Sequence, residues 1–214
     1  PGGAGIMEGE HGAWFALGSD SGPEPVLAVA EWPLVGLPNR ANAVAALAAG
    51  AALGLAAPAM ADALRQFRGL AHRMEAVAEI GGVRYVNDSK GTNVGAVQAA
   101  LEGLDAPFVW IAGGVDKGGD FAALVPALRQ RGRLAVLIGE AAEAIAAAVG
   151  QAVPVVFARD MHEAVARAAA AARAGDAVVL SPGCTSFDQY TGFEARGTDF
   201  RRAVSTLGAD RAQP

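Results

Sequence analysis

Two lysines mark the places in this sequence where binding chemistry is most readily expected. Of the 17 lysines and arginines, only Lys90 and Lys117 are lysines, and each lies in a polar or glycine-rich loop that follows an apolar run. Lysine offers a compact ammonium with three donors, which suits a carboxylate or a phosphate oxygen. Either lysine alone would be read as a solvated loop residue. Two lysines placed in this way favour the binding of a small anion.

Further polar side chains accompany the first lysine. Residues 87–93 form a polar loop after the β-branched and aromatic run 83–86, and this first loop also contains Asp88, Ser89 and Thr92. Apolar residues then recur at helical spacing from residue 94 onward. The first loop therefore joins the end of a strand to the start of a helix, where unpaired N–H groups favour an anion.

Two later loops have the same setting. The second loop, residues 113–120, follows the buried-strand run 108–112, and the third loop, residues 181–190, follows the run 177–180. Glycines in the second loop permit positive φ and let a ligand approach the backbone. Because the carboxyl ends of parallel strands face the crevice where ligands bind, we expect the three loops to form one pocket.

The elements between these loops predict an α/β fold. Short apolar strands alternate with helices beyond residue 70, which indicates a mostly parallel sheet with helices on both faces. The strands are expected at residues 74–80, 83–86, 108–112, 134–138, 153–157 and 177–180, and the helices near residues 93, 121, 140, 161 and 193. Asp160 and Glu163 are spaced as in a capping box, and Gly175 is expected to end the helix that they begin.

The first 70 residues read as a separate, partial domain. Residues 13–17 and 26–30 are expected to form strands around a turn-rich segment, residues 18–25, and helices are expected at residues 39–55 and 59–67. Asn39 is a candidate N-cap for the first of these helices. Residues 68–75 lack helical periodicity, so the domain boundary is placed between residues 70 and 71.

Composition excludes several classes of function. A net charge of −5 and an aromatic content of 6% argue against nucleic-acid binding. The single cysteine, Cys184, excludes an internal disulfide, and the three histidines show no zinc-ligand spacing. The apolar segment 41–63 is interrupted by Gly50, Gly54 and Pro58, and no stretch reaches the roughly 20 apolar residues that span a bilayer. We expect a monomeric cytoplasmic protein without membrane insertion.

Motif chemistry removes further possibilities. Ser186 lacks a G-x-S-x-G elbow and no motif places a histidine beside Cys184, so covalent catalysis is disfavoured. Neither a G-x-G-x-x-G fingerprint nor a G-x-x-x-x-G-K-[ST] P-loop occurs. The residues alone therefore predict a doubly wound α/β domain with a cationic, hydroxyl-rich pocket for a small carboxylate or phosphate.

Four motifs add a resemblance to this reading. HRME at 72–75, NDSKGTNVGA at 87–96, GGVDKGGDF at 113–121 and LSPGCTSFDQYTGFEARG at 180–197 resemble, in this order, the C-terminal part of the Mur ligases. The resemblance covers about residues 39–207. It implies a Rossmann-like domain at residues 71–214, with residues 1–70 as the tail of the central, ATPase-type α/β domain.

The resemblance also implies a reaction and its reactants. The most similar members add glutamate, here expected to be D-glutamate, to UDP-N-acetylmuramoyl-L-alanine in cytoplasmic peptidoglycan precursor synthesis. ATP, with Mg²⁺, phosphorylates the carboxylate of the UDP-linked substrate, and the glutamate amine attacks the acyl phosphate to form an amide. Physical reasoning agrees, because a dicarboxylate calls for cations, hydroxyls and helix N-termini.

Site residues follow from the resemblance position by position. The residues that would hold glutamate are Lys90, Thr92, Lys117, Ser186, Phe187 and Phe193, and those that would contact the nucleotide are Asn39, Asn42, His72, Arg73 and Asp88. Pro38 stands where the family often has histidine, a departure at the adenosine end. No catalytic residue and no metal ligand is assigned to this chain.

Parts of the family pattern are missing from the sequence. The UDP-binding domain, the P-loop, the magnesium ligands and the lysine that the family carbamoylates are not found, so we expect a C-terminal fragment that is inactive alone. Another Mur-type ligase or a folylpolyglutamate synthase would share the fold, but the third loop argues against both. The remaining alternative is a stand-alone or vestigial glutamate- or anion-binding module without catalysis.

Overall fold

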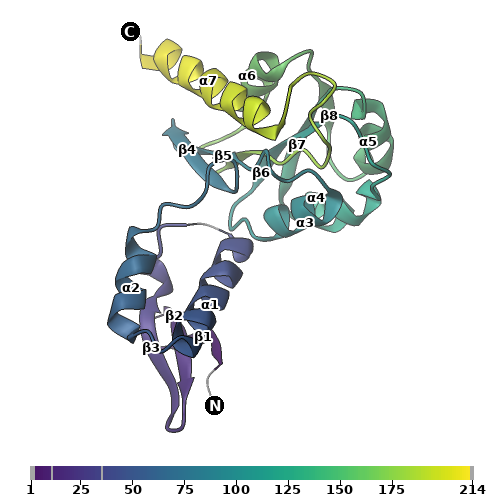
Figure 1. The fold of residues 1–214 in the computed structure, drawn as a ribbon. Helices are drawn as coiled ribbons and strands as arrows, with labels where there is room; N and C mark the ends of the chain where they lie inside the picture. Colours follow the sequence, from purple (N-terminus) through teal and green to yellow (C-terminus); the bar gives the residue numbers. More distant parts are fainter. Residues whose placement is uncertain (1–2, 11, 35, 213–214) are drawn as a thin grey trace. The chain divides into compact units, whose positions relative to one another are not determined.

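The computed structural model of the chain consists of two compact units, Pro1–Gly69 and Leu70–Pro214 (Figure 1). It describes residues 3–10, 12–34 and 36–212. The two units are considered separately below. No helix in the described ranges is both long enough and apolar enough to cross a membrane.

The first unit is a three-stranded antiparallel sheet covered by two helices. Its elements are β1 (Ala4–Gly9), β2 (Gly12–Ser19), β3 (Gly22–Ala28), the 3₁₀ helix η1 (Val29–Glu31), α1 (Leu37–Ala52) and α2 (Ala57–Gln66). Phe15, Leu27 and Leu47 are buried at the centre of its core. This core contains no residue of the second unit, so the first unit has an apolar interior of its own.

Three sequence expectations for the first unit are wrong. Strand β1 was not expected, because its sequence, AGIMEG, shows no regular alternation of apolar and polar residues. The turn predicted at residues 18–25 is shorter, since β2 continues to Ser19 and β3 begins at Gly22. Asn39 is not an N-cap: α1 is preceded by Gly36 at φ 92°, and Asn39 lies inside its first turn.

The second unit is built on a six-stranded sheet with the spatial order β4-β5-β9-β6-β7-β8. Its strands are β4 (Glu75–Ile80), β5 (Val83–Asn87), β6 (Phe108–Gly113), β7 (Gly132–Ile138), β8 (Val155–Phe157) and β9 (Ala177–Leu180). Strand β4 pairs antiparallel with β5, and the other neighbours are parallel. The mostly parallel sheet predicted from the sequence is confirmed.

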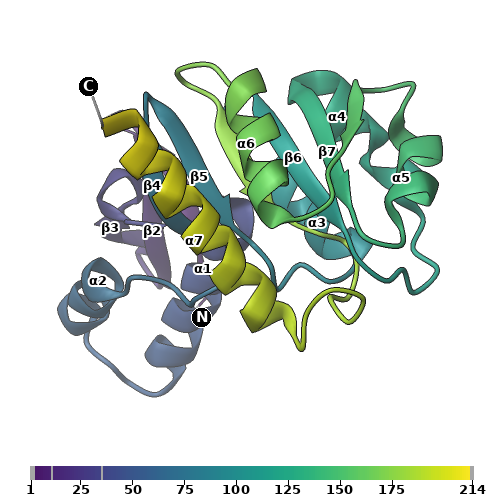
Figure 2. The same cartoon turned by 90° about the horizontal axis from the view of Figure 1, so that it is seen from above.

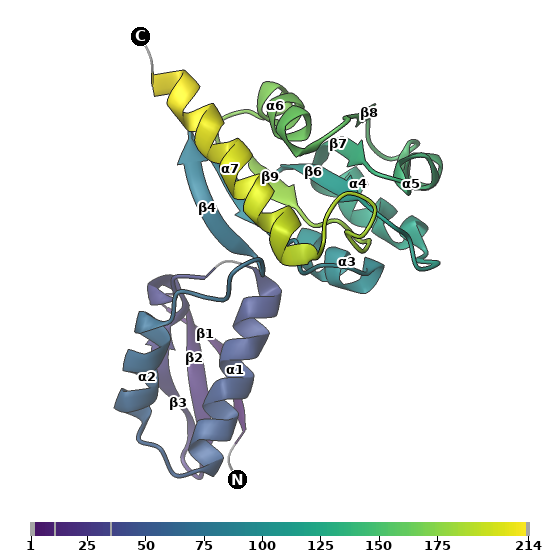
Figure 3. The same cartoon turned by 45° about the horizontal axis from the view of Figure 1, so that its top comes forward.

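Helices cover both faces of this sheet. The helical elements are α3 (Val94–Glu102), the 3₁₀ helix η2 (Phe121–Leu124), α4 (Val125–Arg131), α5 (Ala142–Val149), α6 (Met161–Ala171) and α7 (Phe193–Ala212). Helices α3, α4 and α5 pack on one face and α6 and α7 on the other (Figure 3). Helix α7 runs along β4 and β5 (Figure 2). The arrangement is a three-layer α/β/α sandwich.

Helix α6 shows which local rules hold. Asp160 is its N-cap and accepts the N–H of Glu163 at 2.8 Å, as the spacing predicts. The Glu163 carboxylate accepts the N–H of Arg159 at 3.0 Å. The expected stop at Gly175 is wrong, because α6 already ends at Ala171. Gly175, at φ 93°, instead bonds its N–H to the Gly82 carbonyl at 2.8 Å.

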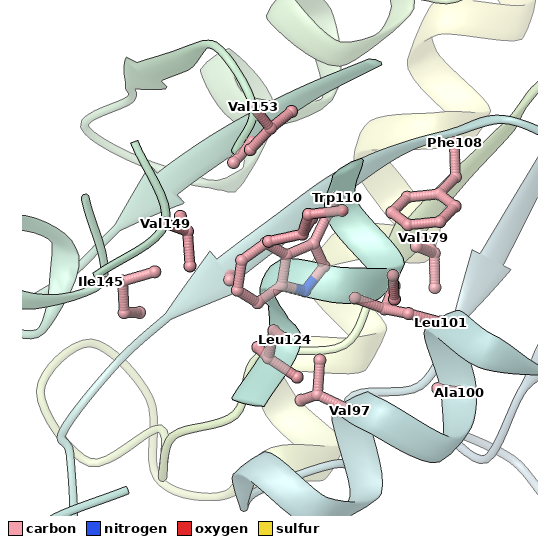
Figure 4. Close-up of a cluster of buried hydrophobic side chains, with 14 of the residues drawn as sticks. Val97, Ala100, Leu101, Phe108, Trp110, Leu124, Ile145, Val149, Val153 and Val179 are labelled. Atoms are coloured by element: carbon pink, nitrogen blue, oxygen red, sulfur yellow. The ribbon is translucent and has the colours of Figure 1, made fainter. Parts of the chain in front are cut away.

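The core on the α3 side reaches the third loop through a tryptophan. Trp110 on β6 is fully buried and lies among Val97, Leu101 and Leu124 (Figure 4). Its indole N–H donates to the Ser181 carbonyl at 2.7 Å. A buried indole needs such a partner for its one donor. The bond ties the start of the third loop to the centre of the sheet.

The strand order brings the three loops together. Strand β9 is last in the chain but pairs with both β5 and β6. The chain leaves β5 through α3 on one face and leaves β9 through α7 on the other. Such a reversal opens a crevice at the carboxyl ends of the strands, where α/β proteins bind ligands. The first, second and third loops follow β5, β6 and β9.

Candidate functional site

The first and third loops are hydrogen-bonded to each other. The N–H of Gly183 donates to the Gly91 carbonyl at 2.8 Å, and the Ser181 hydroxyl donates to the Asp88 carboxylate at 2.8 Å. A Cβ on Gly91 would lie 2.5 Å from Asp88 Oδ2 and 2.8 Å from Ser181 Oγ. The close approach of these two loops therefore requires glycine at position 91.

The second and third loops form a short antiparallel bridge. The N–H of Val115 donates to the Thr185 carbonyl at 2.9 Å, and the N–H of Thr185 donates back at 3.0 Å. Gly114 has φ 128°, and a Cβ there would collide with the Thr185 carbonyl oxygen. A side chain at position 114 would separate the loops. The structure thus brings the three loops predicted from the sequence into one connected edge.

Asp88 is a buried carboxylate at this junction. It is 6% exposed and accepts the N–H of Met74 at 3.2 Å as well as the Ser181 hydroxyl. Burial raises the pKa of the Asp88 carboxyl to about 6, although the Ser181 and Met74 hydrogen bonds and the charge of Arg73 oppose the shift. Asp88 shapes the first loop from within, and its predicted contact with a nucleotide is untested.

Lys90 is held over an aromatic ring. Its ammonium lies 4.0 Å from the centroid of the Phe193 ring, and its backbone N–H donates to the His72 carbonyl at 3.0 Å. Such a cation–π contact fixes the direction of an otherwise flexible side chain. Thr92 lies half-buried in the same loop, where its N–H donates to the Lys90 carbonyl at 2.8 Å. Three of the residues predicted for glutamate are thereby brought together.

Lys117 lies exposed in the second loop. The loop is closed by the Asp116 carboxylate, which accepts the N–H of Gly119 at 2.9 Å. A Cβ on Gly119 would lie 2.6 Å from a methyl group of Val94, the first residue of α3. The loop that carries Lys117 therefore packs against the helix that follows the first loop.

Ser186 and Phe187 have opposite environments in the third loop. Ser186 is 2% exposed, and its backbone carbonyl accepts the N–H of Tyr190 at 2.8 Å. Phe187 is 71% exposed, an unusual setting for a large apolar side chain. The pair thus offers a hydroxyl and an apolar surface next to the bridge formed by Thr185. Contact of either residue with glutamate stays a prediction.

Three consecutive side chains anchor the end of the third loop. Asp188 accepts the N–H of Glu140 at 3.1 Å, and the Gln189 amide donates to the Arg159 carbonyl at 3.3 Å. The Tyr190 hydroxyl donates to Asp199 on α7 at 2.9 Å. The partners lie in the loop between β7 and α5, in the loop between β8 and α6, and on α7. The loop is therefore a fixed part of the sheet edge.

Arg196 on α7 is a residue that the sequence reading did not assign to the site. Its side chain is 1% exposed and bonds to all three loops, through Ser89, Gly113 and Cys184. A signal for it exists in the sequence. Arg196 lies four residues before Phe200 and therefore on the apolar, buried side of α7. A charged residue is rarely found at such a position unless its side chain has polar partners there.

His72 and Arg73 lie in a strained segment at the start of the second unit. His72 and Met74 have φ values of 64° and 45°, in the left-handed region that these residues rarely adopt. The His72 ring is buried, with Nδ1 3.0 Å from the Asn87 amide nitrogen. Burial and then the charge of Arg201 lower the pKa of the imidazole. Arg73 is exposed, so a ligand can reach it more readily than it can reach His72.

Asn39 and Asn42 belong to the first unit. Both lie on α1, where Asn39 is buried and Asn42 is exposed. They share a helix with three-residue spacing, which places them on the same side of it. The structure does not test their predicted contact with a nucleotide.

The sulfur in the third loop is not prepared for nucleophilic chemistry. Cys184 is fully buried, and burial raises the pKa of its thiol to about 12. A reactive cysteine needs a lowered pKa and access to solvent. Cys184 is a packed residue, which agrees with the sequence expectation against covalent catalysis. The site presents cations and hydroxyls, the kinds of group that recognise anions in proteins.

Comparison with known proteins identifies the family. Residues 72–184, more than half of the chain, match the family described as Mur ligase, glutamate ligase domain. A UDP-N-acetylmuramoylalanine--D-glutamate ligase of Nitrosococcus oceani is 48% identical over 205 residues, which cover 95% of this chain and 44% of the relative. The enzyme of the same name from Pseudomonas aeruginosa is 46% identical over 207 residues, covering 95% and 45%. The chain thus spans less than half the length of these relatives.

Solved structures agree on the fold, and the family match and the similar relatives assign the family. A UDP-N-acetylmuramate-alanine ligase from Thermotoga maritima superposes with a TM-score of 0.65 at 14% identity, over 91% of this chain and 43% of that one. A Mycobacterium tuberculosis folylpolyglutamate synthase complexed with ADP gives a TM-score of 0.63 at 20% identity, over 95% and 46%. The chain belongs to the Mur ligase family.

Proposed function

We propose that this chain is the amino-acid-binding part of an ATP-dependent ligase that adds D-glutamate to UDP-N-acetylmuramoyl-L-alanine in peptidoglycan precursor synthesis. The names of relatives 48% and 46% identical to it support the reaction and the D isomer. A role in precursor synthesis implies a cytoplasmic protein with small-molecule substrates. We further propose that it acts as a monomer.

One observation carries the proposal. The three loops at the carboxyl ends of β5, β6 and β9 are bonded into one edge, and this edge holds both lysines of the chain. Glutamate has two carboxylates, and charge-assisted hydrogen bonds from ammonium groups and hydroxyls recognise carboxylates well. In this proposal Lys90, Thr92, Lys117 and Ser186 bind the carboxylates, with Phe187 and Phe193 as apolar walls.

The chain's part in the reaction is orientation. The amine lone pair of glutamate attacks the carbonyl carbon of the acyl phosphate and forms a C–N bond. The bond between that carbon and the oxygen of the phosphate group breaks, so phosphate leaves, and the amine nitrogen loses a proton. Holding both carboxylates points the amine at that carbon and removes much of the entropic barrier to the step. The two lysines suffice for this role without a nucleophile from this chain.

Nucleotide contacts form the second part of the proposal. Asn39, Asn42, His72, Arg73 and Asp88 are proposed to meet ATP, and ADP is bound in the folylpolyglutamate synthase with the same fold. Mg²⁺ is expected to accompany ATP and to balance its phosphate charge. The described residues hold no cluster of three or more histidine, cysteine or acidic side chains suited to a metal ion, so none of them is assigned to it.

The two units then correspond to two domains of the ligase. We propose that residues 1–70 are the tail of the central ATP-binding domain and that residues 71–214 are the glutamate-binding domain. The division of the chain at Gly69 and Leu70 supports this reading. So does the family match, which begins at residue 72.

A titration of the ¹⁵N-labelled chain with D-glutamate tests the binding site. We expect amide shifts to concentrate in residues 88–93, 114–120 and 185–193. Lys117→Ala should abolish binding with the melting temperature unchanged, because Lys117 is exposed and its removal leaves the packing intact. Arg129→Ala, which removes an exposed cation from α4, is the matched control and should bind like the wild type. Unchanged affinity in Lys117→Ala would overturn this assignment.

A further inference from the structure

Arg196 joins the three loops through a single side chain. Its Nε donates to the Ser89 hydroxyl at 3.0 Å, and one terminal nitrogen donates to the Gly113 carbonyl at 3.3 Å. The other terminal nitrogen donates to the carbonyls of Ser89 at 3.0 Å and Cys184 at 3.1 Å. These partners belong to the first, second and third loops. A planar guanidinium is suited to fixing several acceptors at once.

The partners of Arg196 stand next to the residues predicted to bind glutamate. Ser89 directly precedes Lys90, and its hydroxyl also donates to the Phe193 carbonyl at 2.8 Å. Cys184 lies two residues before Ser186. A shift of the guanidinium would therefore move the ammonium of Lys90 relative to the Ser186 hydroxyl.

The charge of Arg196 is not neutralised by contact with an acid. Its four bonds go to carbonyl and hydroxyl oxygens, and no described carboxylate lies within ion-pair distance. Burial lowers the pKa of the guanidinium to about 10, so it stays protonated at neutral pH. The charge of Asp188 opposes this shift without an ion-pair contact, and a ligand carboxylate nearby would further lower the cost of burying the guanidinium.

A second arginine of the same unit, Arg133, is an example of an arginine with a structural role alone. Arg133 at the start of β7 makes a bidentate pair with Asp176, at 2.6 and 3.0 Å. Asp176 is 2% exposed and directly precedes β9, so the pair lies at the opposite end of the strands from the loops. In this pair a carboxylate faces the guanidinium directly. Arg196 has no such partner.

We propose that Arg196 is a positioning residue for the amino-acid substrate: it holds the three loops in register, and its unpaired charge attracts the substrate carboxylates. The proposal rests on the proposed function, since glutamate is the ligand in question. It extends the site beyond the residues that the motifs supply. Arg196 itself is buried beneath the loops and acts through Lys90 and Ser186.

Affinity for D-glutamate tests the proposal on the whole chain. Kd is measured by NMR titration for the wild type, Arg196→Met, Arg196→Lys and Arg133→Met, each at a temperature well below its melting midpoint. Arg196→Met should weaken binding at least tenfold. Arg196→Lys, which keeps the charge but not the planar fork, should weaken it about threefold. Arg133→Met should lower the melting temperature and leave Kd within twofold of the wild type.

The outcomes separate the two proposals. No D-glutamate binding by the folded wild type would overturn the proposed function itself. Binding by the wild type with an unchanged Kd in folded Arg196→Met would overturn only the positioning role. An equal loss of affinity in Arg133→Met would also overturn it, because general destabilisation would then explain the effect. If Arg196→Met does not fold, the affinity of Arg196→Lys for D-glutamate tests the proposal instead. A Kd of Arg196→Lys equal to that of the wild type would contradict the proposal.

Discussion

At the scale of single residues, the buried carboxylate of Asp88 gives the first loop a pH-dependent stability. Its pKa rises from 3.8 to about 6 on folding, so the folded state binds the proton more tightly than the unfolded state. The contribution of this group to the free energy of unfolding is therefore full below pH 4 and is lost as the pH rises toward 6. Two units of pKa correspond to about 3 kcal/mol.

Replacement of this carboxyl should remove the pH dependence. Asp88→Asn does not titrate, so the free energy of unfolding of the wild type relative to this variant should fall by about 2 kcal/mol between pH 4 and pH 7.5. Urea unfolding at both pH values measures the difference. A relative stability that is constant across this range would contradict the burial of an ionisable Asp88.

The ring of Phe193 is predicted to orient Lys90. Phe193→Leu keeps an apolar side chain but removes the cation–π contact at 4.0 Å. We expect D-glutamate to bind about twofold to fivefold more weakly, the effect of losing roughly 0.5–1 kcal/mol. Phe157→Leu, at a partly exposed phenylalanine of β8, is the control and should bind normally. Equal affinities of the two variants would show that the ring does not orient the lysine.

The types of side chain in the sequence predicted which loops form the site, but they did not predict the hydrogen bonds that join these loops. Lys90 and Lys117 could be found because lysine is scarce in a chain that otherwise uses arginine. The four bonds of Arg196 could not, because three of them go to carbonyl oxygens, which every residue has, and the fourth goes to the hydroxyl of Ser89. Only its position on an apolar helix stripe pointed to burial.

At the scale of elements, two glycines of helix α7 are predicted to respond in opposite ways to the same substitution. A Cβ on Gly197 would collide with the ring nitrogen Nδ1 of His72, whereas a Cβ on Gly208 would meet only the end of the Ile80 side chain at 3.4 Å. Gly208→Ala should stabilise the chain by about 0.5–1 kcal/mol, because alanine favours a helix. Gly197→Ala should destabilise it by about 1–3 kcal/mol through the clash.

Thermal or urea unfolding of both variants measures this contrast. The comparison isolates packing, because the helix and the substitution are the same in both cases. A stabilising effect of Gly197→Ala would mean that α7 does not approach His72 as closely as the structure has it.

Element types were predictable where the chain is regular. The parallel strands of the second unit are apolar runs bounded by loops, and each was expected close to its observed position. Strand β1 was missed because a short edge strand rich in glycine has little pattern of its own and is defined by its pairing with β2. The end of α6 was misplaced because tertiary contact, rather than the glycine signal at Gly175, decides where the chain turns.

At the scale of the whole molecule, the two units have separate cores. The core of the first unit and the two cores of the second share no residue. We therefore expect residues 70–214 to fold when expressed alone, since about 145 residues suffice for an independent core. The amide spectrum of this shorter protein should overlay on that of the full chain for the same residues. A spectrum without dispersion would show that the second unit depends on the first.

The most direct test of the account is the activity of a chimeric ligase in which this chain supplies the C-terminal part. The part of the Nitrosococcus oceani relative that lies outside the 205 matched residues is joined to the chain. Hydroxylamine traps the acyl phosphate as a hydroxamate, and mass spectrometry detects any amide product. We predict D-glutamate-dependent formation of the glutamyl product, lost in Lys117→Ala while the hydroxamate persists. Formation of the hydroxamate without any glutamyl product in the unsubstituted chimera would contradict the assignment of this chain as the glutamate-binding part.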